Sequence, residues 1–252
     1  MQIVHGVNPV MEALKSNSSG IKKIVVASGK SRANKIRKIL ELADQKRVDV
    51  EFREIGYIER LAGGKAHQGI VSLCKEYTYS SVEEIIDNRH KLFKESLILV
   101  LDGITDPQNL GSLIRTAHCY GANGVIIPAN RAVSITSTVL KASAGAVYHI
   151  PVVRVVNVAK TIDYLKEKGF WIYGADAGHG QDIYSVDCDG NIGLVMGSEG
   201  RGIRPLVRGK CDFFVSIPIL GRVDSLNVSV AAGVMLHEIT RKKLRYADTS
   251  AL

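Results

Sequence analysis

Three short segments of this 252-residue chain place polar side chains just after apolar runs, where they could take part in chemistry. In each segment a β-type run leads into a turn or the start of a helix, and open α/β sheets bind ligands at such strand ends. The three segments are Leu101–Ala117 (LDGITDPQNLGSLIRTA), Leu194–Ile203 (LVMGSEGRGI) and Ile217–Ser229 (IPILGRVDSLNVS).

The first two segments offer an amide, a guanidinium and a carboxylate. Asn109 falls at the start of a predicted helix, where its structural role would be that of a plain helix cap. Arg115 falls in the middle of the same helix, where its structural role would be that of a surface arginine. Glu199 stands in a turn between Gly197 and Gly200, where it has little local packing role. Glycines allow the backbone of such a turn to approach a ligand closely.

The third segment ends a strand at a proline and then opens a long helix. Ser225 is an ordinary capping residue, so a structural role explains it. Asn227, two residues further on, is less easily explained by capping alone. We therefore count both side chains as candidates for the same site.

Other glycine-rich stretches do not form known nucleotide sites. Ser28–Ser31 resembles the end of a phosphate-binding loop, but Ile24 stands where that loop needs glycine. No G-x-G-x-x-G opens a helix after a strand, which argues against an NAD- or nucleotide-dependent enzyme. Four widely spaced cysteines and seven single histidines give no metal pattern, so we expect no metal.

Charge is concentrated near the N-terminus. The chain has a net charge of +8 and a pI of about 9.3. Residues 1–76 contain 14 Lys and Arg against 8 Asp and Glu, which is +6 of that total. A solvated basic surface is one interpretation, but the concentration of positive charge favours a surface that binds nucleic acid.

The longest aliphatic run, Leu97–Leu101, is too short to cross a membrane. No signal segment is evident, so a cytoplasmic location is expected.

Alternating helical and strand patterns predict an α/β protein with two domains. Residues 1–76 form a small α/β domain, 77–95 a linker with a polar run from Arg89 to Glu95, and 96–252 a domain with a mostly parallel sheet covered on both faces. Helices are predicted to start at Asn8, Ser31, Ile55, Ser81, Asn109, Thr136, Asn157 and Ser225, and the helix from Ile55 to Leu61 is predicted to stop at Gly63-Gly64. Strands are predicted at 21–27, 48–52, 69–74, 97–101, 124–128, 170–175, 192–196 and 213–217.

Taken together, the three segments resemble the SpoU/TrmH family of RNA ribose 2′-O-methyltransferases, part of the SPOUT superfamily. His5–Val10 and His67–Val71 resemble the family's RNA substrate-binding domain, which has an L30e/L7Ae-like fold. The resemblance is strongest to members that methylate a guanosine in bacterial 23S ribosomal RNA. It implies a parallel-sheet SPOUT domain with a C-terminal trefoil knot.

The resemblance also implies the site. S-adenosylmethionine would be the cofactor, held mostly by backbone at Gly197, Ile217, Leu220 and Leu226. The catalytic positions would be Asn109, Arg115, Glu199, Ser225 and Asn227. The partners would be ribosomal RNA and a second copy of the chain in a homodimer. The alternatives are a different rRNA or tRNA site, and a non-catalytic RNA-binding protein. Whether Arg115 acts within its own chain or across the dimer stays open.

The predicted helix from Ser225 to Lys243 carries an apolar stripe with small residues at its centre. This stripe could pack on the chain's own sheet or contribute to a dimer interface. Its residues are Val228, Ala231, Ala232, Met235 and Ile239.

Overall fold

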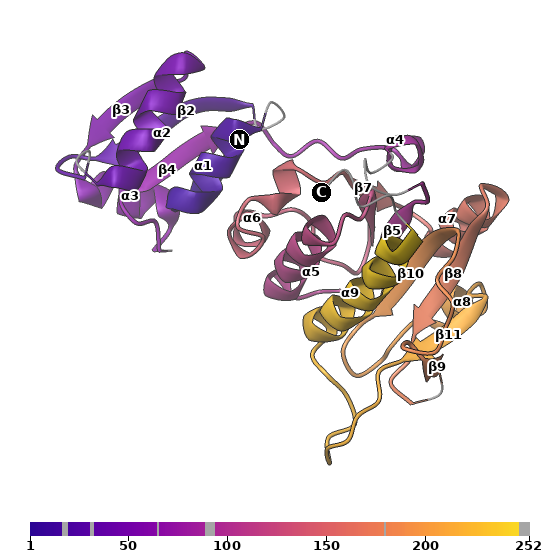
Figure 1. Ribbon diagram of the computed structural model, residues 1–252. Helices are drawn as coiled ribbons and strands as arrows, with labels where there is room; N and C mark the ends of the chain where they lie inside the picture. Colours follow the sequence, from indigo (N-terminus) through magenta and orange to yellow (C-terminus); the bar gives the residue numbers. More distant parts are fainter. Residues whose placement is uncertain (17–19, 31–32, 65, 89–93, 179, 247–252) are drawn as a thin grey trace. The chain divides into compact units, whose positions relative to one another are not determined.

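A computed structural model describes residues 1–16, 20–30, 33–64, 66–88, 94–178 and 180–246 (Figure 1). The chain divides into two compact units, each built on its own sheet. The first unit comprises Met1–Thr78 and Ile135–His149, and the second comprises Tyr79–Ser134 and Ile150–Leu252.

The first unit contains a four-stranded sheet in the order β1-β4-β2-β3. Strands β2 and β3 are parallel, whereas β4 is antiparallel to both β1 and β2. An edge strand at the N-terminus, β1, was not predicted. The elements are β1 (Gln2–His5), α1 (Val7–Lys15), β2 (Ile21–Ala27), α2 (Asn34–Gln45), β3 (Asp49–Arg53), α3 (Ile55–Ala62), β4 (Ile70–Cys74), α6 (Ser137–Ala142) and the 3-10 helix η1 (Ala146–Tyr148).

Residues 135–149 differ from the predicted division, which placed them in the second domain. The Gln2 amide donates a hydrogen bond to the Ile135 carbonyl oxygen at 3.1 Å. The Glu12 carboxylate lies 2.9 Å from the His149 imidazole. These contacts join residues more than 130 positions apart, so the local sequence pattern contains no sign of them.

The second unit contains a seven-stranded sheet in the order β7-β6-β5-β10-β8-β11-β9, in which every recorded pair is parallel. The parallel sheet is as expected, but β7 and β9 were not predicted. The elements are α4 (Val82–Asp87), β5 (Leu97–Asp102), α5 (Pro107–Cys119), β6 (Gly124–Pro128), β7 (Val152–Val155), α7 (Val158–Glu167), β8 (Phe170–Ala175), β9 (Gln181–Asp182), β10 (Asn191–Gly197), α8 (Pro205–Arg208), β11 (Phe213–Ser216) and α9 (Val228–Tyr246).

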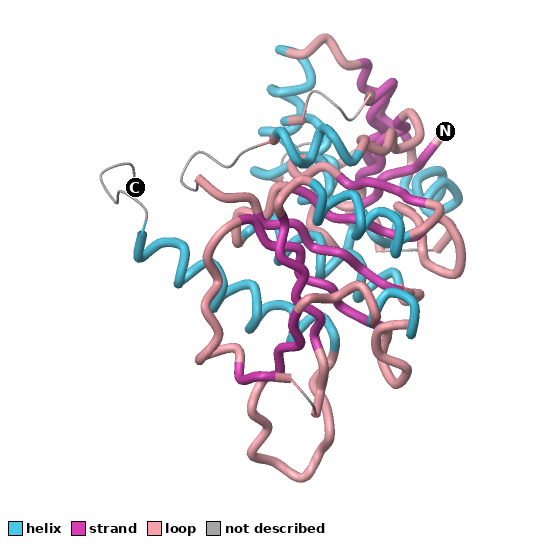
Figure 2. Tube along the Cα trace, turned by 90° about the vertical axis from the view of Figure 1, so that its right-hand side faces the viewer, coloured by secondary structure: helices cyan, strands magenta, loops and turns pink. Residues whose placement is uncertain are grey.

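Helices cover both faces of this sheet (Figure 1). Residues of α4, α7 and α8 share one buried cluster with alternate side chains of the central strands. Helices α5 and α9 pack against each other and against β6 and β10. Figure 2 shows α9 running beside the strands toward the C-terminus. This arrangement brings the starts of α5 and α9 close to the carboxyl ends of β5 and β10.

Several local sequence signals are confirmed. Ser81 and Glu84 form a capping box at α4, and the Asn157 side chain caps α7. Helix α3 ends at Gly63, which has a left-handed φ of 60°. Each of these signals depends on residues within one helical turn, so the chain needs no tertiary contact to form it.

Other predicted helix starts are wrong. Helix α1 begins at Val7 after Gly6, not at Asn8, because the Gln68 side-chain oxygen accepts the Val7 N–H at 2.9 Å. Helix α2 begins at Asn34, and the predicted cap Ser31 lies outside the described residues. The polar run from Arg89 also falls largely outside them.

The apolar stripe of α9 packs within its own unit. Val228, Ala232, Met235 and Ile239 are each at most 6% exposed. These four side chains are therefore covered within the second unit, where α9 contacts α5 and β10. Ala231, the fifth residue of the stripe, is half-buried. Val230, on another side of the same helix, is 52% exposed.

No helix in the described part of the chain is long and apolar enough to cross a membrane.

Candidate functional site

The starts of α5 and α9 place two asparagines beside the turn that follows β10. Asp106, not Asn109, caps α5, because its carboxylate accepts the N–H groups of Gln108 and Asn109. The Asn109 side chain is therefore released from capping. It donates instead to Oε1 of Glu199 at 3.1 Å, across 90 residues of sequence.

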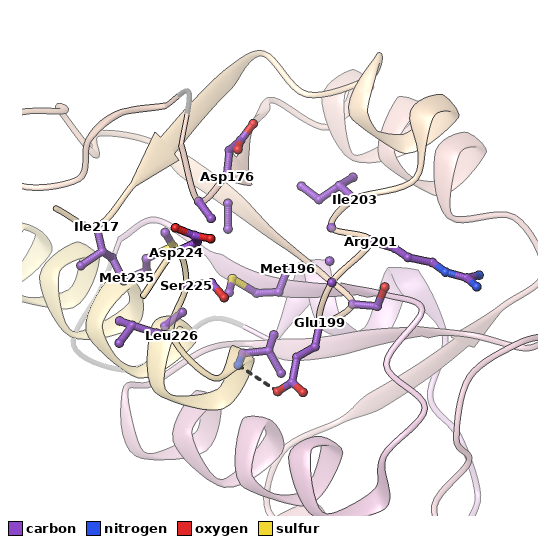
Figure 3. A pocket seen from close by; sticks show the side chains of 18 of the residues that line it. Asp176, Met196, Glu199, Arg201, Ile203, Ile217, Asp224, Ser225, Leu226 and Met235 are labelled. Atoms are coloured by element: carbon purple, nitrogen blue, oxygen red, sulfur yellow. Dashed lines mark hydrogen bonds between the residues drawn. The ribbon is translucent and has the colours of Figure 1, made fainter. Parts of the chain in front are cut away.

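Glu199 is the centre of this polar network, and Figure 3 shows the hydrogen bond that its carboxylate accepts from the start of α9. Its Oε1 also accepts the Asn227 amide at 2.6 Å and the Val228 N–H at 3.3 Å, and the Asn227 amide donates to Asn109 Oδ1 at 3.1 Å. Among the described residues, no hydrogen bond reaches the second carboxylate oxygen, Oε2. The network fixes the carboxylate and leaves one oxygen available to a ligand.

Asn227 has two roles. Its side-chain oxygen accepts the N–H and the hydroxyl of Ser229 at 3.0 and 2.6 Å, which caps the start of α9. Its amide then points back to Glu199 and Asn109. Ser225 lies outside the helix and lines the adjacent pocket, so it is not the cap of α9.

A pocket of about 590 Å³ adjoins this network (Figure 3). Volumes in this range are typical of sites for small-molecule ligands and cofactors. The predicted site residues Gly197, Glu199, Ser225, Ile217 and Leu226 all line it. The remaining lining residues are Ala175, Asp176, Ala177, Met196, Ser198, Gly200, Arg201, Gly202, Ile203, Arg208, Ile219, Asp224, Val228, Ala231 and Met235.

Gly197 is required by close backbone packing. A Cβ atom at this position would lie 2.1 Å from the carbonyl carbon of Gly202 and 2.3 Å from the nitrogen of Ile203. The turn folds back through two backbone hydrogen bonds between Ser198 and Gly202. Any larger residue at Gly197 would displace the wall of the pocket.

An ion pair that the sequence analysis did not assign anchors this turn. Asp102, at the end of β5, is fully buried. Its carboxylate accepts the Arg204 backbone N–H at 2.8 Å and the Arg204 Nε at 2.7 Å. The sequence feature that could have indicated this ion pair was an acidic residue at the end of an apolar strand. The two residues lie 102 positions apart, so only the fold pairs them.

Replacement of Asp102 with alanine should lower the unfolding free energy of the second unit by about 3 kcal/mol, because it removes a buried carboxylate with several hydrogen bonds. For a unit of this size, that corresponds to roughly 6–12 °C in Tm. Differential scanning calorimetry would measure it. Asp163→Ala is the control, since Asp163 pairs with Lys210 at the surface and should contribute under about 1 kcal/mol. Equal Tm values for the two variants would contradict the anchoring role.

A second pair forms part of the pocket wall. The Arg208 guanidinium lies 2.6 Å from the Asp176 carboxylate and stacks over the Phe214 ring at 4.2 Å. Asp224 adds a further carboxylate to the lining. Because Asp176 is paired with Arg208, Glu199 and Asp224 are the carboxylates of the lining outside this pair, and they lie beside an apolar floor.

Two predicted site residues, Arg115 and Leu220, lie outside both the pocket and the Asn109–Glu199–Asn227 network. Arg115 is exposed on α5, six residues after Asn109. Six residues of helix turn the side-chain direction by about 120° and advance it by about 9 Å. Leu220 is fully exposed, on the loop that projects between β11 and α9 (Figure 1). Its predicted contact with a cofactor stays a prediction.

Three of the four cysteines, Cys74, Cys188 and Cys211, are buried or half-buried, whereas Cys119 is exposed. Among the described residues, no group of three or more His, Cys, Asp or Glu could hold a metal ion. Burial raises the pKa of the Cys211 thiol to about 11 and also raises the pKa of Cys74 and Cys188. These thiols are therefore poor nucleophiles near neutral pH.

Comparison with known proteins identifies the architecture. The SpoU rRNA Methylase family matches residues 96–237, and the family of RNA 2′-O ribose methyltransferase substrate-binding domains matches residues 3–80. A Staphylococcus epidermidis protein named for the TrmH family of tRNA/rRNA methyltransferases is 41% identical over 98% of both chains.

Solved structures share the fold. An rRNA methyltransferase from Sinorhizobium meliloti, solved with AdoMet bound, is 26% identical, with a TM-score of 0.77 over 95% of this chain and 87% of that one. The SpoU methyltransferase AviRb from Streptomyces viridochromogenes, also solved with AdoMet, is 24% identical, with a TM-score of 0.80 over 96% of this chain and 90% of that one.

These matches place the chain in a class of RNA methyltransferases. The chain belongs to the SpoU rRNA Methylase family, the TrmH/SpoU class of rRNA and tRNA methyltransferases.

Proposed function

We propose that this protein transfers a methyl group from S-adenosylmethionine to a ribose 2′-hydroxyl, at a guanosine of 23S ribosomal RNA. The observation that supports this most directly is the Asn109–Glu199–Asn227 network at the edge of the pocket. A fixed carboxylate with one oxygen available suits a hydroxyl that must be oriented and deprotonated.

The pocket fits the proposed cofactor. Met196, Ile217, Leu226 and Met235 supply apolar surface for an adenine ring, and the glycine turn supplies backbone groups. The carboxylates of the pocket wall suit the positive charges of a sulfonium and an amino group. When bound, the cofactor supplies a methyl group already activated on sulfur.

The chain's own residues then act on the hydroxyl. Asn109 and Asn227 hold Glu199, and Glu199 Oε2 can accept a hydrogen bond from the 2′-hydroxyl and orient it. The proton can pass to Glu199, to an RNA phosphate or to water. Arg115 is a poor base, since a guanidinium stays protonated, so we assign it to fixing a phosphate and lowering the pKa of the hydroxyl.

We also propose that the active form is a homodimer. Arg115 is exposed and lies about 120° around α5 from Asn109, and in this proposal it reaches the site of a second copy of the chain. The exposed Val230 of α9 gives this surface an apolar contribution. From the family resemblance we further expect the chain between β10 and α9 to form a trefoil knot.

The first unit is proposed to capture the RNA. Its match to a substrate-binding family agrees with the charge of α2 and the residues after it. This segment exposes five basic side chains against two acidic ones; the basic ones are Lys35, Arg37, Lys38, Lys46 and Arg47.

Radiolabelled S-adenosylmethionine and unmodified transcripts of 23S rRNA, 16S rRNA and tRNA would test the proposal. Alkaline hydrolysis needs a free 2′-hydroxyl, so a 2′-O-methylated site is expected to survive as a labelled dinucleotide from the 23S transcript, with guanosine on its 5′ side. Label in mononucleotides would show base methylation instead. Label only in tRNA would show that the substrate is tRNA and not 23S rRNA. RNA binding without methyl transfer would indicate a non-catalytic protein.

A further inference from the structure

The turn after β10 is a short, rigid hairpin. Ser198 and Gly202 exchange two backbone hydrogen bonds of 3.1 and 2.9 Å. Gly200 and Gly202 have φ values of 78° and 64°, which favour glycine. Only Glu199, Gly200 and Arg201 form the tip, so the hairpin fixes the backbone from which both charged side chains extend.

The base of the hairpin is held from both ends. Gly197 packs directly against the backbone of Gly202, and Asp102 anchors Arg204 two residues beyond it. A side chain at the tip therefore projects from a backbone that is already ordered. Ordering costs on ligand binding are then limited to the side chain itself.

Arg201 differs from its two arginine neighbours. Arg204 is paired with Asp102 and Arg208 with Asp176, whereas the described part of the chain shows no ion pair or hydrogen bond for the Arg201 side chain. Arg201 is exposed and lines the pocket. Figure 3 shows it extending away from Glu199, on the outer side of the hairpin.

We infer that Arg201 binds a phosphate of the substrate RNA next to the ribose that is methylated. This inference rests on the proposed 2′-O-methyl transfer. A guanidinium can donate two parallel hydrogen bonds to a phosphate. The 2′-hydroxyl is on the carbon next to the one that bears the 3′-phosphate, so an anchored phosphate places the hydroxyl. Arg201 also offsets the repulsion between the phosphate and the Glu199 carboxylate, which lies two residues away.

The alternative is a solvated surface arginine that contacts nothing. A surface role predicts no difference between Arg201 and other exposed cations. Lys160, exposed on α7 in the same unit, provides the matched control because its replacement removes the same charge.

The test compares wild type, Arg201→Ala, Arg201→Lys and Lys160→Ala on the transcript that accepts methyl groups. We expect Arg201→Ala to raise KM for the RNA about tenfold, while the Kd for S-adenosylmethionine by calorimetry stays within about twofold. The slope of log Kd for RNA against log salt should fall by roughly 0.7–0.9, as for the loss of one phosphate contact. Arg201→Lys should restore the slope but only part of KM, since it cannot form the bidentate pair.

RNA KM and salt slope equal to those of Lys160→Ala would overturn the inference. So would a parallel loss of cofactor affinity, because that pattern would mark a structural role in the hairpin. If wild type methylates no ribose, the proposed function fails. The RNA Kd and its salt slope on the 23S transcript then still decide whether Arg201 contacts a phosphate.

Discussion

Replacement of Arg115 with alanine should lower kcat for methyl transfer by at least 100-fold, which is about 2.7 kcal/mol of transition-state stabilisation. The expected reason is the loss of a guanidinium that holds the substrate phosphate and stabilises negative charge developing on the 2′-oxygen. Because Arg115 is exposed and outside the pocket, folding and S-adenosylmethionine affinity should be nearly unchanged.

Single-turnover kinetics with saturating cofactor would measure this effect on the chemical step. Lys160→Ala, which removes an exposed cation from another helix of the same unit, should keep wild-type kcat. A variant at Arg115 that retains more than about a tenth of the wild-type kcat would remove Arg115 from the chemistry.

Mixing two inactive variants should restore activity if Arg115 acts across a dimer. One variant carries Arg115→Ala and the other carries a block in the cofactor pocket. The block is Ala231→Trp, because Ala231 lines the pocket from α9 and a tryptophan there would fill it. A block at Gly197 is less suitable, because any side chain at that position would collide with backbone and could disturb the fold. Random exchange makes half of all dimers mixed, and each mixed dimer keeps one complete site of two. Activity should therefore approach roughly a quarter of wild type per total subunit.

Subunit exchange must be verified by native mass spectrometry in the same mixture. No recovered activity after complete exchange would place Arg115 and its pocket within one chain. A monomer at micromolar concentration by light scattering would contradict the dimer itself. As a control, each variant is mixed with wild type, which gives the activity expected when subunits exchange but the two variants do not complement each other.

The three segments that the sequence singled out do meet in the fold, because each follows a strand of one parallel sheet. Strands β5 and β10 are direct neighbours, so their carboxyl ends bring Asp102 and Gly197 into register. The sequence could predict this edge, since buried parallel strands appear as continuous apolar runs. It also predicted the helix signals at Ser81, Gly63 and Asn157, which act within one turn.

The role of each polar side chain at that edge depends on contacts between residues that are far apart in the sequence. Asp106 and Asn109 are both capping types, and only the structure shows that Asp106 caps α5 while the Asn109 amide reaches Glu199. Asn227 likewise caps α9 and joins the network, whereas Ser225 lines the pocket.

The sequence by itself determined the parallel α/β architecture, the basic N-terminal segment and the residue types of the site, because periodicity, charge and motif spacing are local properties. The tertiary structure alone decided the Asp102–Arg204 anchor, the membership of residues 135–149 in the first unit and the exposure of Arg115. These features join positions that are about a hundred residues apart or depend on which side of a helix is covered. Their energies arise only when the whole sheet and its helices have assembled.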